Sequence, residues 1–328
     1  MNSLFSDYHK PMPILSYPGC EKAGFKVSEL SFDSDKQAQV MKAVADRCDS
    51  LAAVTLMDLS VEAECFGADV IISEAAVPAV TGVLLKEPGQ AYDLPVPKVG
   101  EKRSGIYIDA VKKAKQLIKD RPVIAGAAAP FSLAARLFGV TETMLLCYDE
   151  PEAVKAVLKK CTEFIIEYIT ALKAAGADGV ILAEPVSGLL SPALEEEFSA
   201  PYIKLLADAV KSSDFAVIYH NCGANVSRMT ASIFSNGCDA YHFGNAVNMR
   251  DMLSASPASV PVMGNLDPVG LFKDGTPVQM KNAVNNILSD CREYKNFILS
   301  SGCDIPPGAK WENISAFFES ARDFSYDL

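Results

Sequence analysis

The sequence predicts an α/β fold, a single (β/α)8 barrel of the TIM type that spans residues 1–328, with an N-terminal helical extension over residues 1–50. Short, β-rich apolar runs alternate with longer segments of helical spacing, and this alternation is typical of a parallel sheet. No G-x-G-x-x-G motif opens a helix after the first strand, which argues against a doubly wound dinucleotide-binding sheet. A length of 328 residues also suits one barrel, because barrels of this kind routinely exceed about 250 residues.

The predicted elements begin with a helix over residues 34–48, where SDKQAQVMKAVADRC has helical apolar spacing. Eight apolar runs then form the candidate strands: 51–57, 69–73, 121–127, 178–184, 215–220, 240–245, 261–265 and 296–301. The run at 69–73 is the weakest candidate, because it could instead belong to a hairpin or an excursion from the barrel. Residues 74–105 are rich in Pro and Gly and are expected to form a loop over the barrel mouth.

Two long amphipathic helices are expected between the later strands. The first covers residues 149–177 and stops at a glycine, and the second covers 191–213, with Ser191 as the N-cap and Pro192 at the first helical position. The acidic run Glu195–Glu197 is expected to be a solvated face of the second helix. Five of the nine cysteines lie in or near helical segments and are predicted to be buried core residues: Cys48, Cys65, Cys147, Cys161 and Cys291.

The composition narrows the class of partner. The formal net charge is −11 and the pI is about 4.9, which argues against nucleic acid or an anionic membrane surface, because both require clustered Lys and Arg. Small molecules or a protein partner remain, and a homo-oligomer stays open. No apolar stretch reaches the roughly 18 residues of a membrane span, and the first residues lack the features of a signal peptide. We therefore expect a cytoplasmic protein, in which nine scattered cysteines do not suggest a disulfide framework.

Polar side chains follow several of the predicted strands at the point where each strand ends. Active sites of barrels lie at the carboxyl ends of the strands, so these side chains should ring one pocket. They are Asp58, Glu184, His220, Cys222, Asn265, Asp267, Cys303 and Asp304.

Three of these residues form a candidate set of metal ligands. In the segment YHNCG, His220 and Cys222 lie two residues apart and would project from one face of a strand toward one point. Cys303 follows another strand, and barrel closure would bring it to the same mouth. A Cys₂His set suits zinc with an open fourth position, for which Glu184 is the candidate ligand. The alternative interpretation is that the histidine and both cysteines only pack in the core.

The chemistry that such a zinc site favours is thiol activation. Two thiolates and a carboxylate leave the complex with a formal negative charge, which makes a poor Lewis acid toward carbonyls but still holds a further thiol as the thiolate. A free thiol with a pKa near ~8.5 is mostly protonated at pH 7, so coordination raises the population of the nucleophile. The reaction that follows is alkyl transfer to sulfur.

Other constellations are weaker. A Ser/His/Asp triad would need one of the three histidines, His9, His220 or His242, and no G-x-S-x-G motif accompanies them. His242 lies inside an expected strand and is predicted to be packed and hydrogen-bonded. Trp311 begins an expected C-terminal helix and is predicted to pack there.

Six segments of the chain together resemble a known family: MDLSVEAECFGADV, GAAAPFSLAARL, AEPVSGLLSP, YHNCG, MGNLDP and LSSGCDIPPGAKWENISAF. Over nearly its whole length the chain is similar to the uroporphyrinogen decarboxylase superfamily, and within it to the zinc-dependent methylcobamide:coenzyme M methyltransferases. The resemblance implies a (β/α)8 barrel whose zinc ligands are His220, Cys222 and Cys303. Asp58 corresponds to the aspartate that the decarboxylases use to hold pyrrole N–H groups, so here it would orient the corrinoid or the acceptor. Glu184 stands where the methyltransferases have an acidic residue, usually in a D-P context.

The sequence and the resemblance together predict a zinc-dependent methyltransferase. Its methyl donor would be a methylcobalamin-type corrinoid on a partner corrinoid protein, because no D-x-H-x-x-G cobalamin motif occurs in the sequence. Its acceptor would be a small thiol such as coenzyme M. Asp58 and Glu184 are the candidate catalytic residues, and Asp58, Asn265 and Asp267 are the candidate cofactor-binding residues.

Alternatives stay open at this stage. A non-catalytic corrinoid- or tetrapyrrole-binding protein could keep the barrel without turnover. A uroporphyrinogen decarboxylase is disfavoured, because its carboxylate-rich substrate needs arginines near the N-terminus in an R-Q-A-G-R type motif, and this chain has no arginine before Arg47. Within the methyltransferases, the acceptor could be another thiol, or a methylated small substrate could be the donor and the corrinoid the acceptor.

Overall fold

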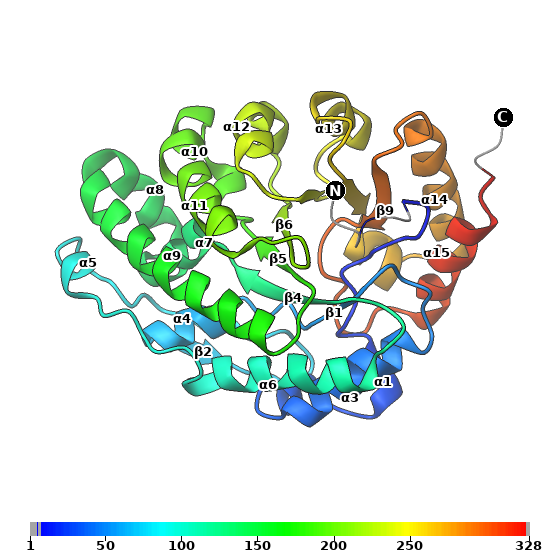
Figure 1. Ribbon diagram of the computed structural model, residues 1–328, viewed down its shortest axis with the longest axis horizontal. Coiled ribbons are helices and arrows are strands. Elements are labelled where there is room, and N and C mark those ends of the chain that lie inside the picture. The colour runs from blue at the N-terminus through cyan, green and yellow to red at the C-terminus, as the bar shows by residue number, and fades with distance from the viewer. Residues whose placement is uncertain (1–4, 6–7, 326–328) are drawn as a thin grey trace.

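Seven parallel strands curl into a barrel wall and carry helices on their outside (Figure 1). The computed structural model describes residue 5 and residues 8–325 of the chain. The strands lie side by side in chain order: β1 (Ala53–Val54), β4 (Val123–Ala128), β5 (Gly179–Ala183), β6 (Ala216–Asn221), β7 (Ala240–Phe243), β8 (Val262–Leu266) and β9 (Phe297–Ser301). Every neighbouring pair is parallel, so the TIM-type fold that the sequence predicts is confirmed.

The N-terminal segment occupies the gap between the last strand and the first. Met12 donates its backbone N–H to the carbonyl of Leu299 on β9 (2.9 Å), and Leu51, just before β1, donates to the carbonyl of Pro11 (2.9 Å). Because these bonds reach both edges of the sheet, residues 11–16 stand where an eighth strand would lie. The sequence predicted only a helical extension in this part of the chain.

Three helices follow that segment and form the predicted extension: α1 (Gly19–Ala23), α2 (Val27–Leu30) and α3 (Ser34–Ala45). The longer helices among the rest cover the outside of the strands (Figure 1). In chain order the rest are α4 (Val61–Phe66), α5 (Gln90–Asp93), α6 (Lys102–Leu117), α7 (Pro130–Phe138), α8 (Val140–Asp149), α9 (Pro151–Ala174), α10 (Pro192–Phe198), α11 (Ala200–Val210), α12 (Thr230–Ser235), α13 (Met249–Ala255), α14 (Pro277–Cys291) and α15 (Trp311–Asp323). Short turns η2 (Ser187–Leu189), η3 (Val226–Arg228) and η4 (Pro268–Lys273) lie among them.

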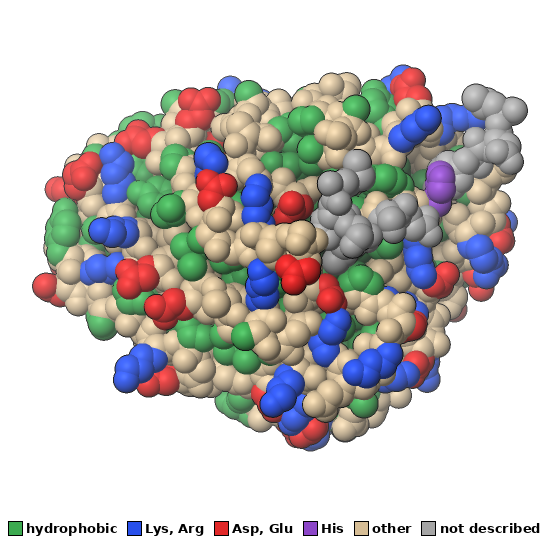
Figure 2. Space-filling view, viewed as in Figure 1, with side chains coloured by type: hydrophobic (Ala, Val, Ile, Leu, Met, Phe, Trp, Pro, Cys, Tyr) green, Lys and Arg blue, Asp and Glu red, His purple; other side chains and the backbone are tan. Residues whose placement is uncertain are grey.

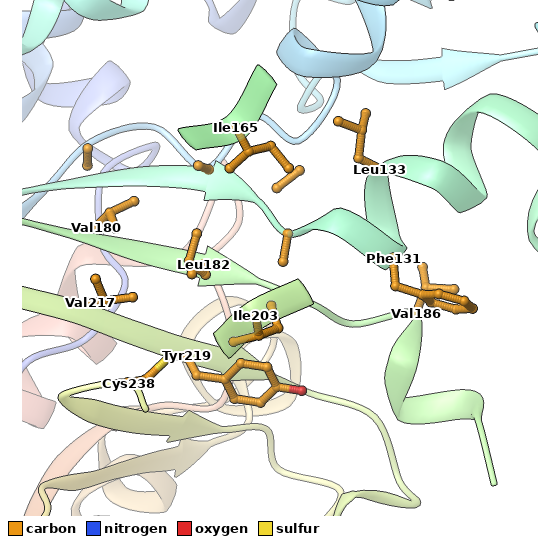
Figure 3. Packing of buried hydrophobic residues seen from close by; sticks show 14 of the residues in the cluster. Phe131, Leu133, Ile165, Val180, Leu182, Val186, Ile203, Val217, Tyr219 and Cys238 are labelled. Carbon is orange, nitrogen blue, oxygen red and sulfur yellow. The ribbon is translucent and has the colours of Figure 1, made fainter. Parts of the chain in front are cut away.

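Alternate residues of each strand define an inner and an outer side of the barrel. The outer residues pack against the helices, as Figure 3 shows for Val180 and Leu182 of β5 beside Ile165 of α9. The inner residues form a separate core cluster that includes Val54, Ile124, Ile181, Ala183, Ala216, Ile218, Ala240, Met263 and Ile298. This alternation decides which side chains at the strand ends can face the centre of the barrel.

The predicted helix over 191–213 is in fact two helices, α10 and α11, which meet at Ser199. Pro201 in the first turn of α11 explains the break, because proline has no N–H to continue the ladder from α10. Ser191 is the N-cap, as predicted, and accepts the N–H of Leu194 (3.4 Å). The prediction that the acidic run is solvated is wrong for Glu195, which is 1% exposed and accepts a hydrogen bond from Ser232 of α12. Burial raises its pKa to about 7.

The weak strand candidate at 69–73 belongs to a hairpin outside the barrel. Its strand β2 (Asp69–Ile71) pairs antiparallel with β3 (Ala79–Thr81). The segment 74–105 was expected to lie over the barrel mouth, but its hydrogen bonds run to the helix layer, where Leu84 bonds to Leu137 of α7 and Lys160 of α9 bonds to Ala91. The five cysteines predicted to be core residues are all buried.

The surface carries charges of both signs. On the face shown in Figure 2, Lys and Arg side chains are interspersed with Asp and Glu, and no basic patch gathers there. In the part of the chain that the structure describes, no helix has the length and apolar character needed to cross a membrane.

Candidate metal centre

Three ligand-type side chains meet at the carboxyl ends of β6 and β9. His220 lies near the end of β6, Cys222 follows directly after that strand, and Cys303 follows β9. Their ligand atoms all lie within 4.8 Å of one another. His220 is 2% exposed and both cysteines are partly exposed, so solvent reaches the cluster on its thiol side.

The donor set fits a zinc ion. Zn–S bonds of ~2.3 Å and Zn–N bonds of ~2.0–2.1 Å at tetrahedral angles place a sulfur and a nitrogen donor roughly 3.6 Å apart. The Nε2 of His220 and the Sγ of Cys303 are 3.5 Å apart. Two thiolates and one imidazole leave one tetrahedral position for an exchangeable ligand, which is the pattern of catalytic zinc sites. His220, Cys222 and Cys303 could therefore hold Zn²⁺ with little rearrangement.

The pKa values of the two thiols of the cluster shift in opposite directions. The neighbouring thiol of Cys303 and the imidazole of His220 lower the pKa of Cys222 below the ordinary value of a thiol. The contact between the two thiols raises the pKa of Cys303, since a second thiolate beside the first is disfavoured. The thiolate is the form that binds metals, so the lowered pKa of Cys222 favours metal binding at this cluster.

Two glycines let the turns that carry the ligands approach their neighbours. A Cβ on Gly244, just after β7, would lie 2.5 Å from both the Cα and the Cβ of Cys222. A Cβ on Gly302, which precedes Cys303, would lie 2.7 Å from the backbone nitrogen of Asn245. Because side chains do not approach backbone this closely, only glycine fits at these two positions without moving a ligand-bearing turn.

A chain of hydrogen bonds supports His220 on the side away from the thiols. Its Nδ1 lies 2.8 Å from the Nδ1 of His242 on β7, and the Nε2 of His242 lies 2.7 Å from the Oγ of Ser300 on β9. Ser300 donates to the backbone carbonyl of Met12 (2.7 Å). His242 is buried, and burial holds its pKa well below the usual range. The prediction that His242 is packed and hydrogen-bonded is confirmed, whereas no sequence signal pointed to Ser300 or Met12.

Glu184 points away from the ligand cluster. In the register of β5 and β6, Ala183 stands beside His220, so the next side chain, that of Glu184, points outward. Its carboxylate accepts the backbone N–H groups of Phe131 (3.0 Å) and Ser132 (2.6 Å) at the start of α7. Complete burial raises the pKa of Glu184 to about 7. The carboxylate therefore caps a helix and is not among the ligand atoms that the structure brings together.

Asp58 takes part in a buried ion pair. One of its oxygens accepts from the Nη1 of Arg103 (2.5 Å) and the hydroxyl of Tyr107 (2.7 Å). The other accepts the backbone N–H (3.0 Å) and the hydroxyl (2.5 Å) of Ser60. Arg103 also pairs with Glu64 (2.7 Å). Both oxygens of Asp58 thus hold partners within the protein, and sequence reasoning missed Arg103 and Tyr107 because α6 supplies them from far along the chain.

Asn265 and Asp267 hold the loops beside the cluster. The amide of Asn265 donates to the carbonyls of Gly244 (2.8 Å) and Val247 (2.7 Å), which steadies the loop that presses on Cys222. Asp267 caps η4 by accepting two N–H groups of that turn, each at 2.9 Å. Asp304 is partly exposed, but its Oδ1 atom is buried, and desolvation of the carboxyl group raises the pKa of Asp304 well above the usual range.

The comparisons with known proteins agree with the barrel and its motifs. Residues 13–324 match the uroporphyrinogen decarboxylase (URO-D) family. The chain belongs to this family. The resemblance that the sequence motifs indicated is thereby confirmed.

Relatives in this family carry names of two kinds. The methylcobamide:CoM methyltransferase MtbA of Methanosarcina acetivorans is 26% identical over 310 residues, which cover 93% of this chain and 89% of that protein. A uroporphyrinogen decarboxylase of Coxiella burnetii is also 26% identical, over 287 residues that cover 84% of this chain and 77% of its own. Sequence identity alone therefore does not separate the two activities.

A solved structure gives the same fold. A methyltransferase from Methanosarcina mazei superposes with a TM-score of 0.85 at 20% identity and covers 95% of this chain and 94% of its own. At this identity the likeness establishes the barrel, and the choice of reaction depends on the residues of the site.

Proposed function

We propose that this member of the family is a zinc-dependent methyltransferase, which moves a methyl group from a methylated corrinoid to a thiol such as coenzyme M. The observation that carries the proposal is the cluster of His220, Cys222 and Cys303, because a decarboxylase has no use for two thiols and an imidazole around one point. The relatives named methylcobamide:CoM methyltransferase supply the donor and the acceptor classes.

Zinc bound to this cluster would hold an incoming thiol as the thiolate at neutral pH. Cys222 and Cys303 contribute one negative charge each, which balances the divalent ion, and the neutral imidazole of His220 adds none. A site of zero formal charge has one position left, and we propose that the acceptor sulfur takes it. This arrangement needs no carboxylate from Glu184, which is occupied at the start of α7.

The methyl transfer itself is balanced without another reactant. The acceptor sulfur attacks the methyl carbon, a C–S bond forms, and the Co–C bond breaks with both electrons staying on cobalt, so Co(III) leaves as Co(I). The proton of the acceptor thiol goes to solvent. We propose that the corrinoid arrives on a partner corrinoid protein, because these 328 residues contain no D-x-H-x-x-G motif to hold one.

The test is methyl transfer from methylcobalamin to a panel of thiols that includes coenzyme M, followed by the loss of the methyl-Co(III) absorbance. Wild-type protein loaded with zinc should form the methylated thiol, and Cys303→Ala should not. Cys147→Ala, which removes a buried thiol from α8 remote from the cluster in the fold, is the matched control and should keep activity. A fully active Cys303→Ala protein would overturn the proposal.

Uroporphyrinogen decarboxylation is the weaker candidate, although decarboxylases match the chain at equal identity. The aspartate expected to hold pyrrole N–H groups, Asp58, is engaged by Arg103 and Tyr107. The first 46 residues contain no arginine for the substrate carboxylates. Formation of coproporphyrinogen from uroporphyrinogen would favour this candidate, and a bound corrinoid without any methyl transfer would favour a non-catalytic binding protein.

A further inference from the structure

The hydrogen-bond chain behind His220 has a direction that can be worked out from its fixed end. The backbone carbonyl of Met12 carries no proton, so Ser300, 2.7 Å away, must donate its hydroxyl proton to it. A hydroxyl has one proton, so the Oγ of Ser300 accepts from the Nε2 of His242, which is also 2.7 Å away. The Nε2 of His242 therefore carries a hydrogen.

The next bond in the chain can then run in one direction only. A neutral imidazole has a single N–H, so the Nδ1 of His242 is a bare acceptor. It lies 2.8 Å from the Nδ1 of His220, which must supply the hydrogen of that bond. In its neutral form His220 is therefore left with a bare Nε2, and this is the atom that lies 3.5 Å from the Sγ of Cys303.

Only a cationic His242 would reverse this bond, and the surroundings do not favour a charge there. His242 is 1% exposed, and the side-chain partners of its two ring nitrogens are the ring of His220 and the hydroxyl of Ser300, neither of which carries a negative charge. An imidazolium buried without an anionic partner is strongly disfavoured. The neutral form is therefore the one that this site accommodates.

We propose that His242 and Ser300 are positioning residues, which fix His220 as its Nδ1–H tautomer and so direct the Nε2 lone pair at the metal. The role of His242 and Ser300 in directing His220 at a metal rests on the proposed zinc site. The direction of the hydrogen bonds does not depend on that site. The wrong tautomer would place a hydrogen on Nε2, and a protonated nitrogen cannot bind a metal. Because Met12 belongs to the segment that stands in place of an eighth strand, closure of the barrel and orientation of the ligand depend on the same residues.

The first test reads the tautomers directly in the metal-free full chain under reducing conditions. The chain has three histidines, so long-range ¹H–¹⁵N correlation spectra of the imidazoles contain few signals, and single variants of His9 and His242 assign them. The expected result is Nδ1–H with bare Nε2 for His220 and Nε2–H for His242. An Nε2–H or cationic His220 would overturn the inference. Since no zinc or substrate is present, this result stands apart from success or failure of the proposed methyl transfer.

The second test measures zinc affinity by competition with a chelator. His242→Phe keeps a ring but removes the acceptor for His220, and it should weaken zinc binding by about 10- to 100-fold. His242→Asn can place its side-chain oxygen near the lost Nδ1 and should recover part of the affinity. Equal affinity for His242→Phe and wild type, with both folded by circular dichroism, would overturn the inference.

Two neighbouring serines allow the effect of the hydrogen-bond chain to be distinguished from the effect of the N-terminal segment. Ser300→Ala interrupts the chain and should weaken zinc binding, although less than His242→Phe. Ser301→Ala removes the neighbouring hydroxyl, which accepts the N–H of Ile14 in the same N-terminal segment but does not touch either histidine, and should leave zinc affinity unchanged. Equal losses in the two variants would show that the segment matters and the chain does not, which would overturn the proposed role of Ser300.

Discussion

Glu184→Ala is expected to destabilise the protein without releasing zinc. The carboxylate is fully buried and accepts the backbone N–H groups of Phe131 and Ser132 at the start of α7. Alanine would leave both donors unpaired in the core, and each buried unpaired group costs about 1–3 kcal/mol, so the expected loss of unfolding free energy is about 2–6 kcal/mol. Glu184→Gln keeps one acceptor oxygen and should cost about half as much.

The Gln variant also carries a pH signature. Burial raises the pKa of Glu184 to about 7 from an ordinary value of 4.5, so its folded form favours the protonated carboxyl. The stability that this raised pKa contributes is complete below pH 4.5 and is lost as the pH rises through about 7. Between pH 5 and pH 8, ionisation of Glu184 should lower the unfolding free energy of the wild type by about 2–3 kcal/mol. The Gln variant has no carboxyl at this position and should not show this loss. The difference in unfolding free energy between the wild type and Glu184→Gln should therefore become smaller as the pH rises.

Guanidinium chloride unfolding of the metal-free proteins at pH 5 and pH 8, together with zinc content after reconstitution, measures both effects. Glu196→Gln on the exposed side of α10 is the matched control and should change stability by less than about 0.5 kcal/mol. A Glu184→Gln protein that keeps its stability but loses zinc would refute the helix-cap role and would restore Glu184 as the fourth ligand.

Three further outcomes are expected. Gly244→Ala should weaken zinc binding measured by chelator competition, because its Cβ would press on Cys222, whereas Gly89→Ala, with no atom near its Cβ, should not. Arg103→Met should lower the unfolding free energy by about 3–5 kcal/mol in denaturant titrations, because it leaves a buried carboxylate without its cation; a loss below 1 kcal/mol would contradict that role. Iodoacetamide should label Cys222 and Cys303 first in the folded, metal-free protein, as read by peptide mass spectrometry, and zinc should protect them; rapid labelling of the other, buried cysteines would contradict the fold.

Much of the barrel could be predicted because its strands are short apolar runs between helices with clear amphipathic spacing. His220 and Cys222 could be placed together because two residues is the period of a strand, and Cys303 because parallel strands end at one rim. The break at Ser199 was also readable in principle, since Pro201 cannot continue the helix before it.

The errors have physical causes. The strand before Glu184 is apolar on both faces, so its sequence has no alternation of apolar and polar residues. The sequence therefore does not show which side chains point into the barrel. Only the register of β5 with β6 shows that Glu184 points outward. The N-terminal segment PMPILS contains two prolines and does not read as a strand, although it fills that place. The partners of Asp58 come from α6 and the support of His220 comes from Ser300 and Met12, and such contacts are set by tertiary packing alone.

The most direct test of the central claim is the metal content of the purified protein by elemental analysis, beside the Cys222→Ala/Cys303→Ala double variant. The arrangement of His220 and the two cysteines predicts about one zinc per chain in the wild type and none in the double variant. Absence of zinc from the wild type, even after reconstitution under reducing conditions, would contradict it and would leave the three side chains as packing at the end of the barrel.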